Sequence, residues 1–261
     1  MDEASPLWGI CPFEKIKDGL IDCKAKNRLP AKSQSVIIAC FPYLIDKSFY
    51  VGGNISKYAV VTDYHEVATA RLNDAAKKLR TLYPENEFAV FADNSPIPEV
   101  RTACTAGLGV RGINTLLITE KYGSYVFLGE IVTDLKIESP NHDYSFCIGC
   151  QKCIAACPTG AISNASFKNE DCLSAITQKK GLLSEKEERL MNECGCVWGC
   201  DICQDVCPMN KNAATTEIKE FLSHPVAYIS EECELSGRAY EWRGRKVIER
   251  NLKISKKEFS L

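Results

Sequence analysis

Cys147-Ile-Gly-Cys150-Gln-Lys-Cys153-Ile-Ala-Ala-Cys157-Pro158 is the stretch that decides how the second half of this chain folds. At this C-x2-C-x2-C-x3-C-P spacing, the first three thiolates can bind one corner of a [4Fe–4S] cube. The fourth cysteine is carried away by the turn at the proline and typically binds the other cluster of a two-cluster protein. The stretch therefore predicts a pair of iron–sulfur clusters.

A second cysteine run supplies ligands for the second cluster. Cys200-Asp-Ile-Cys203-Gln-Asp-Val-Cys207-Pro208 has C-x2-C-x3-C-P spacing, which is one cysteine short of a full repeat. Cys172 lies between the two runs and can supply the missing ligand. Together these positions make eight cysteines, the thiolate count for two cubes that each take four cysteine ligands.

Zinc and disulfides are the alternative uses of so many cysteines. Zinc sites usually take two well-separated C-x2-C pairs and do not call for two triple-cysteine runs that each close with Cys-Pro. A disulfide framework is typical of a short secreted chain. The start, Met1-Asp-Glu-Ala-Ser-Pro6, has neither the basic nor the apolar region of a secretory signal. Two [4Fe–4S] clusters are therefore favoured over both alternatives.

The composition is that of an ordinary globular protein. The 261 residues are 45% hydrophobic and 25% charged, and a net charge of −2 gives no general attraction to nucleic acid or membrane. No stretch approaches the roughly 18 uncharged apolar residues of a transmembrane helix. We therefore expect a cytoplasmic protein that does not enter the membrane, in a compartment where thiols stay reduced.

Of the fifteen cysteines, seven lie outside the predicted ligand set. Cys194 and Cys196 come just before the second run, so they are spare ligands or reactive thiols. A scattered cysteine is most often a small buried hydrophobe. We expect that role for the remaining five, which are Cys11, Cys23, Cys40, Cys104 and Cys233.

The first half of the chain alternates between strand and helix patterns. Apolar runs predict strands over residues 35–41, 88–92, 116–118 and 125–132. Apolar residues at helical spacing predict a helix over 63–82, another is expected over 99–106, and glycines make 106–112 a loop. A composition shift follows Pro140. We therefore divide the chain into an α/β domain (1–142), a small cluster domain (143–212) and a charged helical segment (213–261).

Several motifs together resemble those of the epoxyqueuosine reductases, over roughly residues 35–255. In the first half they are Asn54-Ile-Ser-Lys-Tyr-Ala59, Asp63-Tyr64-His65, Phe91-Ala-Asp93-Asn-Ser-Pro96, Ala106-Gly-Leu-Gly109, Asn114-Thr-Leu-Leu-Ile118 and Phe127-Leu-Gly-Glu-Ile131. In the second half they are Cys157-Pro-Thr-Gly-Ala-Ile162, Gly199-Cys-Asp-Ile-Cys-Gln204 and Arg243-Gly-Arg-Lys-Val-Ile-Glu-Arg-Asn251.

The resemblance implies both a fold and a reaction. The implied fold is an α/β (α+β) cobalamin-binding-type domain followed by a ferredoxin-like double [4Fe–4S] cluster domain. The implied reaction is reduction of the epoxide of epoxyqueuosine in tRNA, with electrons from a donor such as ferredoxin or flavodoxin. Corrinoid reductive dehalogenases share the same pair of modules.

The resemblance also implies a role for individual residues. Cys147, Cys150, Cys153 and Cys207 would hold the cluster nearer the corrinoid, and Cys157, Cys172, Cys200 and Cys203 would hold the outer one. Asp93 matches the family's proton donor, and an apolar pocket is expected to raise its pKa. Tyr64 would lie in the same pocket, whereas His65 is not needed as a cobalt ligand. Asp93 would contact the corrin, and so would a loop through its residues Gly107, Gly109, Gly112, Asn114 and Thr115.

The sequence departs from the family at several places. Ile113 stands where the family has a lysine, and Val100 where it has an arginine. The chain ends at Leu261, where the tRNA-modifying enzymes continue into a helical-repeat domain. Three hypotheses remain open: a reductase of a small-molecule or nucleoside substrate, a shortened tRNA epoxide reductase, and a non-catalytic electron-transfer or corrinoid-reducing module that serves a partner.

A basic stretch near the end bears on the tRNA hypothesis. Residues 238–257 hold eight Lys and Arg against two Glu, and such a stretch either contacts phosphates or forms a solvated helix face.

Overall fold

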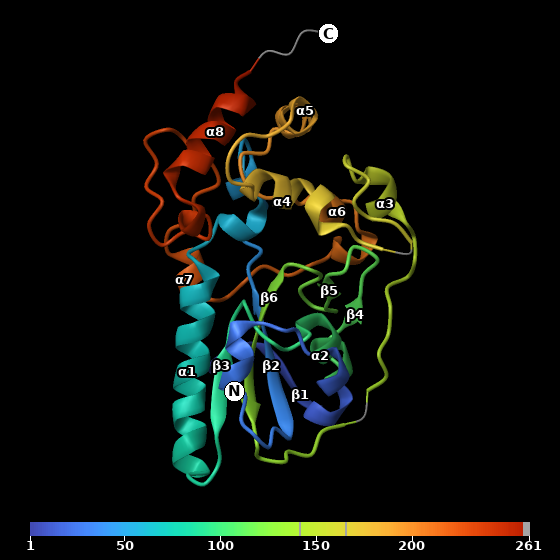
Figure 1. Cartoon of the computed structure of the whole chain (residues 1–261), viewed down its shortest axis with the longest axis vertical. Coiled ribbons are helices and arrows are strands. Elements are labelled where there is room, and N and C mark those ends of the chain that lie inside the picture. Colours follow the sequence, from blue (N-terminus) through green and yellow to red (C-terminus); the bar gives the residue numbers. More distant parts are fainter. Residues whose placement is uncertain (141, 165, 258–261) are drawn as a thin grey trace. The chain divides into compact units, whose positions relative to one another are not determined.

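The computed structural model describes residues 1–140, 142–164 and 166–257 and divides the chain into two compact units. Unit 1 comprises residues 1–42 and 64–149, and unit 2 comprises residues 43–63 and 150–261. Each unit is built from segments that are distant in the sequence (Figure 1). This division differs from the three consecutive segments expected from composition, because residues 43–63 leave the first half to join the second.

Unit 1 is built on a four-stranded antiparallel sheet with the strand order β1-β2-β6-β3. Three of its strands lie where apolar runs predict them: β2 (Ser35–Pro42), β3 (Phe88–Phe91) and β6 (Val126–Thr133). The strand β1 (Leu7–Pro12) was not predicted, and it pairs with β2 alone at the edge of the sheet. A predicted mixed α/β fold is thus confirmed, while the sheet itself is antiparallel.

Both faces of this sheet are covered, which explains why all eight positions of β2 are buried. On one face Val36, Ile38 and Cys40 belong to an apolar cluster with Ala103 of the short helix α2 (Glu99–Thr105). On the other face lies α1 (Tyr64–Leu82), which matches the predicted helix and packs against β3 and β6 (Figure 1). A strand buried on both faces takes mainly apolar side chains, and its one polar residue, Ser35, accepts a hydrogen bond from the N–H of Ile137 at 2.9 Å.

The close approach of α1 to the sheet depends on a glycine. A Cβ on Gly129 would meet the side chain of Leu72 at 2.8 Å. Leu72 lies on the buried stripe of α1 with Val67, Ala68, Ala75 and Ala76, where residues three to four apart share one face of a helix. Gly129 therefore lets the middle of this stripe reach the centre of the sheet.

Three of the scattered cysteines are core residues, as expected. Cys11, Cys40 and Cys104 are buried in the cluster on the α2 face of the sheet. Burial raises the pKa of Cys11 and Cys104 to about 11, so these thiols stay protonated at neutral pH. They pack as small hydrophobes and are unsuited to bind iron.

Unit 2 consists of short helices around a core that contains Trp198 and Tyr240. The segment 213–261 was expected to be helical, but it runs irregularly between two helices and its last residues, 258–261, lie outside the described part. The helices of the unit are α3 (Lys152–Ala156), α4 (Leu173–Gln178), α5 (Glu185–Glu193), α6 (Ile202–Asp205), α7 (Lys219–Leu222) and α8 (Arg245–Ser255).

Residues 43–63 are held in unit 2 by paired hydrogen bonds. The amide of Asn54 donates to the carbonyl of Ile229 at 2.9 Å, and its oxygen accepts from the N–H of Ile229 at 2.8 Å. Asp201 accepts from the Ser56 hydroxyl at 2.5 Å and from the backbone N–H of Lys57 at 2.6 Å. The motif Asn54-Ile-Ser-Lys-Tyr-Ala59 thus serves to bind this segment to the second cysteine run.

The helix α8 fixes the segments that flank the cysteines. The buried amide of Asn251 donates to the carbonyls of Thr177 and Val197, at 2.7 Å in each case. Arg250 donates to the carbonyls of Lys179 and Gly181 just after α4, where the last helical carbonyls lack intrahelical partners. Among the described helices, none has both the length and the apolar character that crossing a bilayer requires.

Candidate functional site

A strained turn follows β3 and presents Asp93. Asp93 and Asn94 both have left-handed backbone angles, with φ of 62° and 46°. Asp and Asn tolerate this conformation better than most residues, but two in succession are uncommon. Strain of this kind persists where the surroundings impose it, often at functional sites.

Asp93 is paired with a histidine from α1. The Nε2 atom of His65 lies 3.0 Å from Oδ2 of Asp93. Tyr64 stacks on His65 with ring centroids 4.0 Å apart, and on Phe127 of β6 with centroids 4.0 Å apart and planes 7° apart. The first turn of α1 therefore brings two rings that stack on each other, those of Tyr64 and His65, to the end of β3.

The direction of the Asp93 pKa differs from the expectation. The hydrogen bond from His65 lowers the pKa of Asp93 below its ordinary value, although partial burial acts in the opposite direction. The side chain is 57% exposed, so its desolvation is incomplete. The predicted raised pKa of Asp93 is therefore wrong for this structure, in which an ionised Asp93 accepts a hydrogen bond from His65.

Two other carboxyl groups near Asp93 do have raised pKa values. Burial, reinforced by the charge of Asp93, raises the pKa of Glu99 to about 7. Glu130 on β6 is fully buried, and burial together with Glu99 raises its pKa well above the ordinary value. One oxygen of each, Oε1 of Glu99 and Oε2 of Glu130, has no hydrogen-bond partner among the described residues. Both carboxyls are therefore suited to hold a proton.

Glu130 also anchors the turn that carries Asp93. The hydroxyl of Ser95 donates to Oε1 of Glu130 and accepts from the N–H of Ile97 at 3.1 Å. In the sheet, Glu130 is paired in register with Phe91 of β3 and Ile38 of β2. The acid in the middle of an apolar strand thus positions the turn 93–96 through Ser95.

A cavity of about 210 Å³ adjoins these groups within unit 1. It lies between the titratable side chains and an apolar wall, so it brings a proton source next to a low-dielectric surface. Its lining residues are Tyr64, Asp93, Glu99, Val100, Leu116, Leu117, Ser124, Val126, Phe127 and Leu128.

The glycine loop has local packing roles. It forms the two-stranded ribbon of β4 (Val110–Arg111) and β5 (Leu117–Ile118), which replaces part of the expected loop. A Cβ on Gly107 would meet His142, one on Gly109 the carbonyl of Ile118, and one on Gly112 the side chain of Asn114.

The residues of the loop that were expected to contact a corrin therefore have roles inside unit 1. Thr115, with a φ of 69°, closes a turn by donating its N–H to the carbonyl of Gly112 at 2.9 Å. Asn114 is buried.

The structure gathers several of the predicted cluster cysteines in unit 2. Cys172 and Cys194 each lie near enough to Cys200 and Cys157 for the ionisation of these thiols to be linked. Among the described residues, no group of His, Cys, Asp and Glu side chains is close enough to hold a single metal ion. A cubane needs no such gathering, because each cysteine binds a different iron.

Cys157 is prepared to act as a thiolate. Partial burial raises its pKa, but hydrogen bonds from the Thr159 hydroxyl and from the backbone N–H groups of Thr159, Ile162 and Ala161 outweigh that effect. The net pKa of Cys157 is lowered. Hydrogen bonds to ligand sulfurs also tune cluster potentials, so the turn Pro158–Ile162 fits an iron–sulfur ligand.

The boundary between the two units falls inside the first cysteine run, after Gly149. Cys147 belongs to unit 1, where its N–H donates to the carbonyl of Arg111 at 3.0 Å. Cys150 and Cys153 belong to unit 2, together with Cys207.

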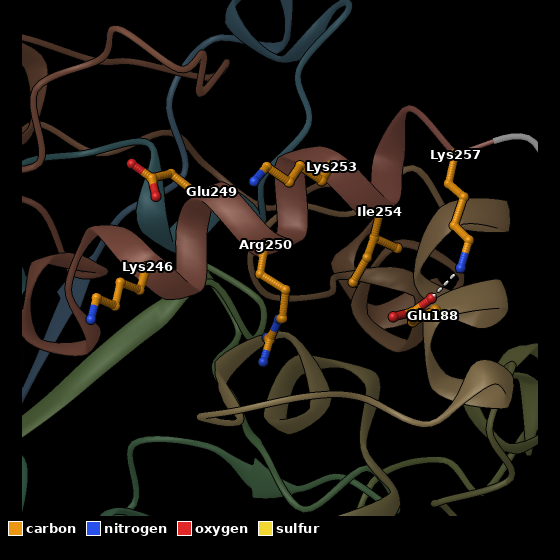
Figure 2. A pocket seen from close by; sticks show the side chains of 7 residues that line it. All are labelled: Glu188, Lys246, Glu249, Arg250, Lys253, Ile254 and Lys257. Atoms are coloured by element: carbon orange, nitrogen blue, oxygen red, sulfur yellow. Dashed lines mark hydrogen bonds and ion pairs between the residues drawn. The ribbon is translucent and has the colours of Figure 1, made fainter.

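A second hollow, of about 440 Å³, lies along α8 in unit 2 (Figure 2). Lys246, Arg250, Lys253 and Lys257 line it. Lys257 forms an ion pair with Glu188 at 2.7 Å, which is the dashed line in Figure 2. Glu249 also lines it, and Arg250 is committed to carbonyl groups after α4. The hollow is thus basic overall but partly neutralised.

Two family models match segments of this chain. Residues 25–94 match the family described as epoxyqueuosine reductase QueG, DUF1730, and residues 146–210 match the 4Fe-4S double cluster binding domain. The epoxyqueuosine reductase of Listeria monocytogenes is 34% identical over 202 residues, which are 72% of this chain and 53% of that protein. The chain is a relative of the epoxyqueuosine reductases. It spans about half to two thirds of the length of several curated relatives.

Solved structures of epoxyqueuosine reductases share this fold. The enzyme from Streptococcus thermophilus superposes with a TM-score of 0.78 at 24% identity, covering 97% of this chain and 78% of that one. An epoxyqueuosine reductase solved with an epoxyqueuosine-modified tRNA stem loop has a TM-score of 0.74 at 24% identity, covering 95% and 76%. A reductive dehalogenase described as B12-dependent has a TM-score of 0.53 at 17% identity, covering 96% and 34%.

Three residues of this candidate site were not assigned a role from the sequence. His65 was considered only as a cobalt ligand, and its partner Asp93 lies 28 residues away. Glu99 lies at the start of a predicted helix, and nothing in the sequence around it indicated that this acid is buried or has a role in the site. Glu130 did carry a signal, because a single acid within the apolar run of β6 calls for a buried partner or a function.

Proposed function

We propose that this chain is an iron–sulfur and cobalamin-dependent reductase that removes an epoxide oxygen from a queuosine-type nucleoside. The observation that carries the proposal is the group of titratable side chains around one cavity of unit 1, in a chain whose other half matches a double-cluster domain. Electrons would reach the substrate through the clusters from a donor such as ferredoxin or flavodoxin, in the cytoplasm.

The residues of unit 1 fit part of a corrinoid. The cavity of about 210 Å³ is smaller than the roughly 300–1,000 Å³ of pockets for drug-sized ligands, so it can admit one edge of the macrocycle or the reacting part of the substrate. The stacked rings of Tyr64 and Phe127 supply a flat apolar wall. When bound, cobalamin supplies a strongly reducing cobalt centre.

Proton delivery falls to the chain's own residues. Loss of an epoxide oxygen as water consumes a pair of electrons and a pair of protons, so the site must be re-protonated in each turnover. Asp93 is the most exposed of the three acids and is the group that meets the substrate, with His65 as its hydrogen-bond partner. Asp93 is ionised in this structure, so it must take up a proton before it can donate one to the substrate. Glu99 lines the same cavity and, with its pKa raised to about 7, is the proposed source of that proton.

The cluster ligands follow the family pattern. Cys147, Cys150, Cys153 and Cys207 would hold the inner cluster, and Cys157, Cys172, Cys200 and Cys203 the outer one. The electrostatic coupling of Cys157, Cys172 and Cys200 supports the outer set.

The substrate is proposed to be presented by tRNA, as in the relative solved with a tRNA stem loop. The basic hollow along α8 offers Lys246 and Lys253 for phosphate contact (Figure 2). A free nucleoside is the alternative substrate, because Glu188 and Glu249 reduce the positive charge of this hollow.

The Asp93→Asn variant tests the proposal. Asparagine keeps the shape of the side chain but carries no transferable proton, and general acid catalysis is worth about 100- to 10,000-fold. Turnover of epoxyqueuosine in tRNA or as the nucleoside should fall by a factor in that range, while reduction of the clusters stays unchanged.

The matched control is Asp143→Asn, at an exposed position away from the cavity. Unchanged turnover in Asp93→Asn on both substrates would leave the chain as an electron-transfer module for a partner protein.

A further inference from the structure

The strained turn after β3 is contacted from outside by residues 20–29, a segment with no role in the proposed proton delivery. The N–H of Ile21 donates to the carbonyl of Pro96 at 2.8 Å, and the thiol of Cys23 donates to the carbonyl of Asn94 at 3.9 Å. Both acceptors belong to the turn. We call residues 20–29 the N-terminal strap, because they hold the turn through its backbone carbonyls.

The N-terminal strap is itself fixed to the body of unit 1. Leu20, Ala25 and Leu29 pack against the apolar cluster on the α2 face of the sheet. Just before the strap, the guanidinium of Arg101 on α2 donates to the carbonyl of Lys15 at 2.8 Å. A contact with the strap therefore restrains the turn.

Arg28 joins the strap to the end of β3. Its Nη2 atom donates to the carbonyl of Val90 at 2.5 Å, and its guanidinium lies 4.7 Å from the ring centroid of Phe91. A planar guanidinium can donate from its edge while its face stacks on a ring. β3 lies at the edge of the sheet, where backbone carbonyls can accept hydrogen bonds from outside. Phe91 is the last residue of β3, so Arg28 fixes the strand just before the turn begins.

These contacts identify what imposes the strained geometry. Asp93 and Asn94 both have left-handed backbone angles, and such strain persists only where the surroundings over-determine it. On the inner side, the hydroxyl of Ser95 donates to the buried Glu130. On the outer side, Arg28 holds the chain before the turn and the strap holds the turn itself. A turn held from the inner side alone would relax and carry the Asp93 carboxyl away from the cavity.

We propose that Arg28 is a positioning residue for Asp93, which it keeps at the cavity by fixing the end of β3 against the N-terminal strap. The inference rests on the proposed function, in which Asp93 meets the substrate. Arg28 is not among the described residues that line the cavity, and it acts through the backbone of β3. Its loss should therefore slow the chemical step and leave substrate binding nearly unchanged.

The first experiment follows the turn itself, by hydrogen exchange of the intact protein. The N–H of Ile97 donates to the hydroxyl of Ser95, so its exchange reports opening of the turn. The β2 amides report opening of unit 1 as a whole. Loss of a hydrogen bond from a charged group shifts an equilibrium by about 10- to 100-fold, so Arg28→Ala should speed exchange at Ile97 by that factor relative to β2.

The second experiment measures turnover of epoxyqueuosine in tRNA or as the nucleoside. Displacing a catalytic group by about 1 Å can cost on the order of 100-fold in rate. In Arg28→Ala, kcat should fall by roughly 10- to 100-fold while KM stays within about twofold of wild type. Arg28→Lys should recover only part of kcat, because an ammonium group cannot donate to Val90 and lie flat on Phe91 at once.

Arg80 provides a matched control on the same strand. Its guanidinium donates to the carbonyl of Phe88, at the start of β3 and away from the turn. Arg80→Ala removes the same kind of contact from the same strand. It should leave kcat and the exchange of Ile97 relative to β2 as they are in wild type.

Three results would overturn the inference. They are no faster exchange at Ile97 relative to β2 in Arg28→Ala, an unchanged kcat in Arg28→Ala when Asp93→Asn is slow, and equal effects of Arg28→Ala and Arg80→Ala. Unchanged turnover in both Asp93→Asn and Arg28→Ala would instead overturn the proposed function. If Arg28→Ala fails to fold, Arg28→Lys must show both effects in smaller size, and the absence of either overturns the inference.

Discussion

Glu99→Gln should change how the stability of unit 1 depends on pH. Glu99 sits in the first turn of α2, where the helix dipole favours a negative charge by about 0.3–1 kcal/mol. Burial and the charge of Asp93 outweigh that effect, since they raise the pKa of Glu99 from 4.5 to about 7. Folding therefore favours the protonated acid.

The size of the effect follows from linkage. The folded protein binds more protons than the unfolded chain between pH 4.5 and about 7, so the free energy of unfolding falls as pH rises through this window. At 1.36 kcal/mol per pKa unit, the full contribution is roughly 3 kcal/mol, of which about 2 kcal/mol is lost between pH 5.5 and 8. Glutamine has the same shape and does not titrate, so it removes this loss.

Hydrogen exchange of the β2 amides measures the opening free energy of unit 1, because β2 lies between β1 and β6. After correction for intrinsic exchange rates, the opening free energy of wild type should fall by about 2 kcal/mol more between pH 5.5 and 8 than that of Glu99→Gln. Glu85→Gln, at an exposed turn, should follow wild type. If the opening free energies of wild type and Glu99→Gln depended on pH in the same way, Glu99 would not hold a proton near neutral pH. The proposal that Glu99 supplies protons to Asp93 would then be refuted as well.

Three further variants test other parts of the structure. Cys157→Ala should remove about four of eight iron atoms and spare the cluster of its neighbours in the first run; stoichiometric zinc in place of iron would contradict the cluster assignment. His65→Ala should still bind cobalamin with a base-off spectrum, and loss of binding would show that this histidine ligates cobalt. Asn251→Ala leaves two buried carbonyls without their hydrogen-bond donor, so it should lower the free energy of unfolding, measured by thermal unfolding, by roughly 2–4 kcal/mol. A decrease of less than about 0.5 kcal/mol would contradict this role of Asn251.

Local patterns were sufficient to predict most elements of unit 1. Helix α1 and strands β2 and β6 follow from apolar periodicity, which each segment carries in its own sequence. The direction of strand pairing could not be predicted, because a strand buried on both faces looks the same in parallel and antiparallel sheets. The edge strand β1 was hidden by its glycine and its terminal proline, which are tolerated at an edge.

The candidate site was predictable only in part, for a similar reason. The motif places Asp93 at the end of β3, and this position is what the structure shows. The direction of its pKa depends on His65, which only the folded chain brings to 3.0 Å. Glu99 owes its raised pKa to burial, a property that the first turn of a short helix does not reveal in sequence.

The docking of residues 43–63 into unit 2 has a consequence for how this protein is made and dissected. Asn54 and Ser56 find partners at Ile229 and Asp201, which leave the ribosome more than a hundred residues later. Unit 2 therefore cannot complete its core until nearly the whole chain has been synthesised, and contacts of such long range fold slowly. A fragment that ends near residue 142 would carry residues 43–63 without their partners, so a corrinoid-binding fragment should be made with this segment replaced by a short polar linker.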